Sequence, residues 1–140
     1  HFRIRPFARN KIRSIKKEPK LYLWDWSEVA NDAARYENMV ASHLLKLVHW
    51  LNDREGFRAD LYFLRDTSMR EVDFLVTIDE KPWFAVEVKS QSEQLAPNLP
   101  YFRDRLAIPF SYQLVKKQGI DKVSNGVRIL SADKFLAALI

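Results

Sequence analysis

Residues 71–89 read EVDFLVTIDEKPWFAVEVK, and this stretch decides the fold. Apolar and polar residues alternate in two runs, 71–78 and 83–89, with the period of half-buried β-strands. The turn residues 79–82 lie between the two runs. The stretch therefore predicts an antiparallel hairpin.

Acidic residues occupy hairpin positions that share a face with apolar side chains. Simple alternation puts Asp73 on one strand face with Leu75. It puts Glu87 on one face with Trp83 and Lys89. Trp83 is therefore the tryptophan expected to share the candidate catalytic face. These charges need a compensating partner if the face is buried.

The two acids are expected to meet across the hairpin. A loop of odd length, such as 78–82, would place Asp73 directly opposite Glu87, with Cβ atoms about 4.5–5.5 Å apart. Like charges at that separation repel each other unless they share a proton or bind a cation. Lys89 supplies one positive charge on the face of Glu87. Because no soft ligand is near, carboxylate oxygens would favour Mg²⁺ or Mn²⁺ over zinc.

The strongest predicted helix covers residues 31–54. Asn31 or Asp32 can cap its start, and Gly56 can end it. Glu37 falls on its apolar stripe, where a carboxylate must be desolvated, paired or bound to a metal. The stripe comprises Ala33, Val40, Ala41, Leu44, Val48 and Leu51.

The remaining elements complete an α/β pattern. A short edge strand is expected around residues 2–7 and an extended piece at 20–25. Further strands are expected at 57–65, 109–115 and 126–130, and helices at 99–106 and 132–139. From the long helix onward, the order is helix, three strands, helix, strand, strand, helix, which predicts a mixed β-sheet flanked by helices.

Composition excludes several classes of protein. A chain of 140 residues, 47% of them hydrophobic, is long enough for one domain with a core. The absence of cysteine excludes disulfide scaffolds, thiolate metal sites and cysteine nucleophiles, and agrees with a cytoplasmic location. Three glycines cannot build the common phosphate-binding loops. No apolar run approaches the length that spans a membrane.

Positive charge is concentrated near the amino end. The net charge is +5, but residues 1–20 alone carry +7. We expect residues 1–29 to be a basic arm or connector from an upstream module and residues 30–140 to be the folded domain. Such an arm could bind along a nucleic-acid phosphate backbone or an acidic partner surface, or it could be a solvent-exposed connecting segment. Its basic residues are Arg3, Arg5, Arg9, Lys11, Arg13, Lys16, Lys17 and Lys20.

The spacing of these acidic residues resembles the spacing of the site residues in a nuclease superfamily. Asp73, followed fourteen residues later by Glu87-Val88-Lys89 and preceded by a helix with a glutamate, resembles PD-(D/E)XK nucleases. Val72 stands where many members have proline. A closer resemblance is to the carboxy-terminal domain of unknown function that follows a AAA-type ATPase module in many prokaryotic proteins. It is carried by PKLYLWD (19–25), YENMV (36–40), Leu44-Leu45, EVDFLV (71–76) and FAVEVK (84–89).

The resemblance implies a restriction-endonuclease-like fold and a metal-dependent nuclease. Glu37, Asp73, Glu87 and the backbone carbonyl of Val88 would hold Mg²⁺ or Mn²⁺. Asp73, Glu87 and Lys89 would be catalytic, with Lys89 orienting the attacking water or helping to deprotonate it. The substrate would be nucleic acid, with DNA favoured over RNA, and the domain would be the carboxy-terminal part of a AAA-type ATPase.

Other interpretations stay open. The domain could keep the nuclease fold and only bind nucleic acid or dock within such an ATPase. It could be an interaction domain without nucleic acid, and the hairpin charges could form a surface salt bridge. Gln113 and Tyr112 could contact substrate, although an ordinary polar strand face explains them as well.

Overall fold

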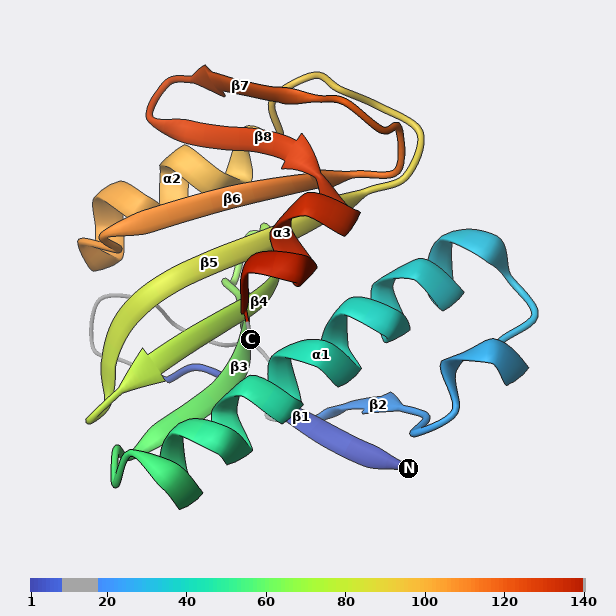
Figure 1. Ribbon diagram of the computed structural model, residues 1–140. Helices are drawn as coiled ribbons and strands as arrows, with labels where there is room; N and C mark the ends of the chain where they lie inside the picture. Colours follow the sequence, from blue (N-terminus) through green and yellow to red (C-terminus); the bar gives the residue numbers. More distant parts are fainter. Residues whose placement is uncertain (9–17, 140) are drawn as a thin grey trace.

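The computed structural model describes residues 1–8 and 18–139. Within these residues, eight strands form one mixed sheet in the order β2-β1-β3-β4-β5-β6-β8-β7 (Figure 1). The elements are β1 (Phe2–Pro6), β2 (Lys20–Tyr22), the short 3₁₀ helix η1 (Trp26–Glu28), α1 (Asp32–Arg54), β3 (Ala59–Arg65), β4 (Glu71–Ile78), β5 (Lys81–Lys89), α2 (Asn98–Leu106), β6 (Phe110–Val115), β7 (Asp121–Ser124), β8 (Val127–Ser131) and α3 (Ala132–Leu139).

Helices cover both faces of the sheet, so the predicted α/β class is confirmed. α1 and α3 lie on one face and α2 on the other (Figure 1). The strands from β3 to β5 are antiparallel, whereas β5, β6 and β8 run parallel. Buried apolar side chains form one core on the α1 face, including Leu44, and a second on the α2 face, including Phe102. None of the helices among the described residues has the length and apolar character needed to cross a membrane.

Local signals explain the bounds of α1. The side chain of Asn31 accepts a hydrogen bond from the N–H of Ala34 at 2.9 Å and caps the helix. Gly56, at φ +69°, provides the left-handed residue just beyond its end. Most of the predicted stripe is buried, but Ala33 is exposed, because complete burial begins only at Asn38.

Two strands within residues 1–29, β1 and β2, belong to the sheet. β1 pairs in parallel with β3 through Arg5 and Tyr62, and β2 pairs with β1 in antiparallel orientation. Of the basic residues expected in an arm, Arg3, Arg5 and Lys20 therefore lie on paired strands. The other five, Arg9, Lys11, Arg13, Lys16 and Lys17, lie outside the described residues.

The β4–β5 turn is tighter than predicted. Asp79 and Glu80 have φ angles of 50° and 66°, as in a two-residue turn of type I′, so β5 begins at Lys81 rather than at 83. The one-residue offset that places Asp73 opposite Glu87 comes from a bulge in β5 and not from the loop. Val76 pairs with Phe84 and Thr77 with Pro82, which leaves Trp83 unpaired between them.

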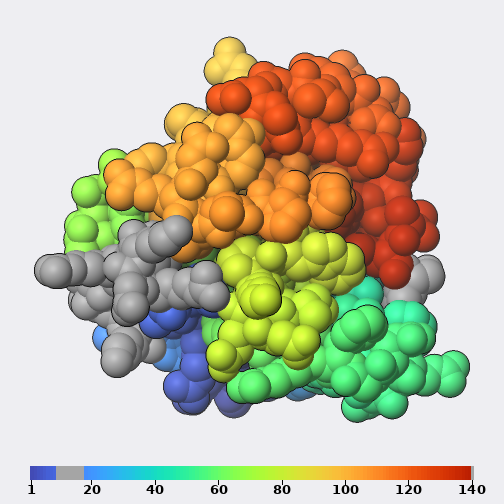
Figure 2. All heavy atoms as spheres, turned by 90° about the vertical axis from the view of Figure 1, so that its left-hand side faces the viewer, coloured from blue at the N-terminus to red at the C-terminus, as the bar shows by residue number. Residues whose placement is uncertain are grey.

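The bulge also overturns the expected position of Trp83. Its side chain packs on the α1 core rather than on the face of Glu87. There it lines a cavity of about 460 Å³ with Leu51 and Phe57. Figure 2 shows the β4–β5 turn, in yellow-green, next to the end of α1 and the residues after it, in green. Trp83 therefore does not share a face with Glu87, and it lies near the β4–β5 turn, at the other end of the hairpin from Asp73 and Glu87.

Strand β7 was not predicted. All of its residues are exposed, so it lacks the alternation of buried and exposed positions that marks a half-buried strand. Asn125 and Gly126, both with positive φ, form the turn that joins β7 to β8. This Asn-Gly pair is the signal that would have indicated the hairpin.

A buried asparagine fixes the chain after β2 onto α1. The side chain of Asn38 accepts a hydrogen bond from the N–H of Leu23 at 2.9 Å and donates one to its carbonyl at 2.7 Å. Asn38 is only 4% exposed, so water cannot easily replace these bonds. The contact holds the end of β2 beside Glu37, the residue before Asn38 on the helix.

Asn38→Ala should lower the free energy of unfolding by about 1–3 kcal/mol, because both main-chain groups of Leu23 lose their partner. Urea unfolding measures the change. Asp53→Ala, at an exposed position of the same helix, brings a similar gain in helix propensity and should shift stability by no more than about 0.5 kcal/mol. Equal effects of the two substitutions would contradict this role for Asn38.

Candidate active site

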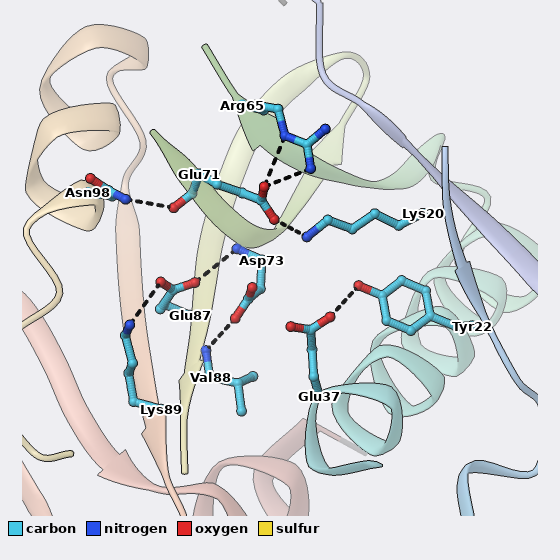
Figure 3. A network of polar contacts seen from close by, with 10 residues as sticks. All are labelled: Lys20, Tyr22, Glu37, Arg65, Glu71, Asp73, Glu87, Val88, Lys89 and Asn98. Carbon is cyan, nitrogen blue, oxygen red and sulfur yellow. Dashed lines mark hydrogen bonds and ion pairs between the residues drawn. The ribbon is translucent and has the colours of Figure 1, made fainter. Parts of the chain in front are cut away.

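The three predicted acids come from three elements and meet where β4 and β5 separate. Glu37 lies on α1, Asp73 on β4 and Glu87 on β5 (Figure 3). At this end of the hairpin, the last paired residues are Phe74 and Val86, so the register continues toward Asp73 opposite Glu87, as expected.

Side chains replace the main-chain pairing beyond this point. The N–H of Asp73 donates to Oε1 of Glu87 at 3.1 Å, and the N–H of Val88 donates to Oδ2 of Asp73 at 2.8 Å. Each carboxylate thus holds the main chain of the opposite strand. Val88 contributes its N–H to this arrangement, whereas its predicted role is that of a carbonyl ligand.

A second bulge turns Asp73 toward α1. Leu64 pairs with Val72 and Tyr62 with Leu75, so Asp73 and Phe74 together oppose the single residue between them on β3. Alternation is broken there: Val72 packs in the α2 core, and Phe74 in the α1 core.

The consequence is a correction of the expected face. Simple alternation grouped Asp73 with Leu75, but Leu75 faces α2, whereas the carboxylate of Asp73 lies near that of Glu37 on α1 (Figure 3). Glu87 follows Ala85 on the other face, and its carboxylate reaches Asp73 at the gap between the strands. The bulge is therefore what brings the acids together.

Tyr22 of β2 positions Glu37. Its hydroxyl donates a hydrogen bond to Oε2 of Glu37 at 2.8 Å. Its ring lies 5.9 Å from that of Phe74, between centroids, within the α1 core. Sequence reasoning did not assign Tyr22 to the site, although it lies in the PKLYLWD segment that carries the family resemblance.

Crowding of buried carboxylates raises their pKa values. Burial, followed by the charge of Asp73, raises the pKa of Glu37 to about 7. Burial and the charge of Glu87 raise the pKa of Asp73 to about 8. Burial also raises the pKa of Glu87, against the hydrogen bonds from Asp73 and the charge of Lys89. A bound proton or a cation would relieve this repulsion.

Lys89 provides a positive charge at the rim. Its Nζ lies 4.0 Å from Oε2 of Glu87, and its side chain is 44% exposed, so the ammonium can reach both the acid and a solvent-borne ligand. Its position two residues after Glu87 on the same strand follows the predicted spacing.

The donor set fits a hard divalent cation in type and charge, because it consists of carboxylates whose repulsion is only partly compensated. In the described part of the chain, no group of three or more His, Asp or Glu residues is arranged to hold a metal ion. Asp73 and Glu87 instead accept main-chain N–H groups, so a cation would compete with those contacts.

The other candidate from the sequence, Gln113, has a structural role. Its side chain is 0% exposed, accepts the N–H of Ala96 at 2.7 Å and donates to the carbonyl of Gln94 at 2.6 Å. It thereby fixes the segment that follows β5. Tyr112 packs against Phe84 and Phe135. Neither residue joins the acids.

Comparison with known proteins identifies a family without an assigned activity. The family described as a domain of unknown function (DUF4143) matches residues 33–135, which is most of the chain. Searches of the curated proteins and of the solved structures return no match. The expected resemblance to a domain of unknown function is confirmed, and the assignment to PD-(D/E)XK nucleases stays a prediction.

With divalent cations removed by a chelator, the free energy of unfolding should fall as pH rises from about 4 to about 8. Because the pKa values of Glu37 and Asp73 are raised to about 7 and about 8, the folded chain holds protons that the unfolded chain has released. Their stabilising effect is complete below the unfolded pKa and is lost as pH passes the folded one. Urea unfolding at a series of pH values measures the slope.

Asp73→Asn should flatten this slope. Asp121 is a contrast, since hydrogen bonds from Arg128 and Lys134 lower its pKa. The stability that Asp121 contributes is present above its unfolded pKa and is lost on acidification. Asp121→Asn should therefore change the free energy of unfolding only in the acidic part of the pH curve. Stability that does not change between pH 4 and 8 would rule out the raised pKa values.

Proposed function

The chain belongs to the DUF4143 family, and from this premise we propose that its site is that of a divalent-metal-dependent phosphodiesterase acting on DNA. The observation that carries the proposal is the meeting of Glu37, Asp73 and Glu87 where β4 and β5 separate, with Lys89 beside them (Figure 3). The proposal includes kinship with restriction-endonuclease-like folds.

Buried carboxylates of this kind are costly for a purely structural domain. Burial, and then the charge of a neighbouring acid, raises the pKa values of Glu37 and Asp73. A fold under no functional demand would lose little by replacing them with apolar residues. Sites that bind a cation retain such clusters because the ion supplies the missing charge.

The residues of the chain have separate roles in this proposal. Glu37, Asp73 and Glu87, with the carbonyl of Val88, would hold Mg²⁺ or Mn²⁺. When bound, the cation would polarise the scissile phosphodiester and lower the pKa of the attacking water. Lys89 would orient that water and neutralise charge on the phosphate, since its ammonium is accessible at the rim. Tyr22 would keep Glu37 oriented through its hydrogen bond.

One observation favours a second function, in which the domain binds nucleic acid or docks within an ATPase without cleavage. Asp73 and Glu87 both accept main-chain N–H groups and thus already join β4 to β5. That role needs no cation. The cleavage experiment below separates the two functions.

The proposed place in a larger protein comes from the family resemblance. We propose that the domain forms the carboxy-terminal part of a AAA-type ATPase. The coding sequence upstream of His1 tests this directly: a phosphate-binding loop there supports the linkage, and a start codon immediately before His1 contradicts it.

The chain with Mg²⁺ or Mn²⁺ should nick plasmid DNA or cleave single-stranded DNA, and a chelator should abolish the reaction. Asp73→Asn and Glu87→Gln should each lower the rate by roughly 100-fold or more, because even partners that only orient metal ligands contribute about 10–100-fold. Calorimetry should show Mn²⁺ binding that both substitutions weaken. Asp121→Asn, an acid on the far edge of the sheet, should leave rate and binding unchanged.

Two outcomes would overturn the proposal. A chain that binds neither Mg²⁺ nor Mn²⁺ has no metal-dependent activity at this site. A chain that binds DNA but leaves it intact with either ion has the second function.

A further inference from the structure

A group of three charged residues adjoins the acids on the β3 side, and we call it the Glu71 group. Glu71 of β4 is contacted at Oε1 by Nζ of Lys20. Arg65 of β3 donates from Nε and Nη2 to Oε2 of Glu71 at 3.0 and 2.8 Å. Both cations lie over the ring of Phe63, at 4.8 Å for Nζ of Lys20 and 5.1 Å for Cζ of Arg65.

The Glu71 group lies on the face of the sheet that carries Glu37 and Asp73. Phe63, beneath both cations, belongs to the α1 core. Glu71 precedes Asp73 by two residues, before the bulge, and therefore shares its face. Figure 3 shows the Glu71 group and Lys89 on different sides of the carboxylates. Cations thus flank the acids on both sides.

The Glu71 group carries one positive charge in excess. Two cations share one carboxylate, while their side chains and that of Glu71 are only 20–30% exposed. Withdrawing charges from water is costly, and a second cation on an already paired acid adds to that cost. Part of this excess is matched to the neighbouring acids, because the charge of Lys20 opposes the rise in the pKa values of Glu37 and Asp73.

The chain contains a matched group at the opposite edge of the sheet. Asp121 of β7 is held by Arg128 and Lys134, again one acid with an arginine and a lysine. These side chains are 31–57% exposed, so the group costs little to form. The comparison shows that the burial, not the pattern, is unusual in the Glu71 group.

Both cations keep donors beyond those used on Glu71. Among the contacts of the described residues, Arg65 uses two of its three guanidinium nitrogens, and an ammonium has three N–H groups. Arginine and lysine with free donors are the usual ligands of a phosphate. DNA that approaches the carboxylates is repelled by them and needs favourable contacts with cations nearby. The excess positive charge of the Glu71 group lies on the same face of the sheet as Glu37 and Asp73.

We propose that Lys20 and Arg65 bind a backbone phosphate of the DNA next to the cleaved bond, with Glu71 holding both cations in place when no DNA is bound. This inference rests on the proposed function, because it needs DNA at the acidic site. It assigns a substrate contact to β2, a strand that lies before the part of the chain matched by the family.

The experiment measures binding of a short fluorescein-labelled DNA duplex by anisotropy, with Mg²⁺ present and Glu87→Gln in every protein so that no cleavage occurs. Lys20→Met and Arg65→Met should each weaken binding about tenfold, as for a hydrogen bond to a charged group. Each should also reduce the slope of log K against log salt by about 0.9. Lys20→Arg should retain binding.

Glu71→Gln separates phosphate binding from a structural role. It removes the competing carboxylate, so binding should be retained or strengthened. If the Glu71 group only supported the fold, Glu71→Gln would weaken binding as Lys20→Met does. Arg128→Met and Lys134→Met, from the matched group, should leave both affinity and salt slope unchanged.

Failure of this inference is distinct from failure of the proposed function. Cleavage by the wild-type chain together with unchanged salt slopes for Lys20→Met and Arg65→Met would overturn the inference alone. Binding that depends on both cations without cleavage by the wild-type chain would overturn the nuclease and leave a DNA-binding site. A chain that binds no DNA would overturn both.

Discussion

Repulsion among buried carboxylates is the constraint around which this end of the molecule is organised. The pairing between β4 and β5 ends at Phe74 and Val86, and beyond it Asp73 and Glu87 each accept an N–H from the opposite strand. The hydroxyl of Tyr22 on Glu37 and the ammonium of Lys89 near Glu87 compensate part of the charge. Each of these four contacts places a donor or a positive charge near a carboxylate of the site.

The periodic elements could be predicted from the sequence because they depend on local patterns. α1 runs from Asp32 to Arg54 where a helix over 31–54 was expected, and β4 has the predicted bounds. The two bulges could not be predicted, because a bulge is defined by the partner strand as much as by its own residues. Alternation alone therefore misplaced Trp83 and assigned Asp73 to the wrong face.

The candidate acids could be named from their spacing, but their environment could not. Glu37 was singled out because it interrupts an apolar stripe, and the structure places it beside Asp73. Its partner Tyr22 and the neighbouring Lys20 come from a strand fifteen or more residues away in the chain, so no local pattern links them. A basic cluster suggested a solvated arm, whereas Lys20 is drawn into the sheet by pairing with Ile4.

The position of β2 has a practical consequence for choosing a fragment to express. The family match begins at residue 33, within α1, so a boundary set from it would discard β1 and β2. Such a fragment would leave Glu37 without its tyrosine, expose the edge of β3 and uncover the ring of Phe63. Poor solubility or lost activity of that fragment would report on its boundary rather than on the chemistry of the family.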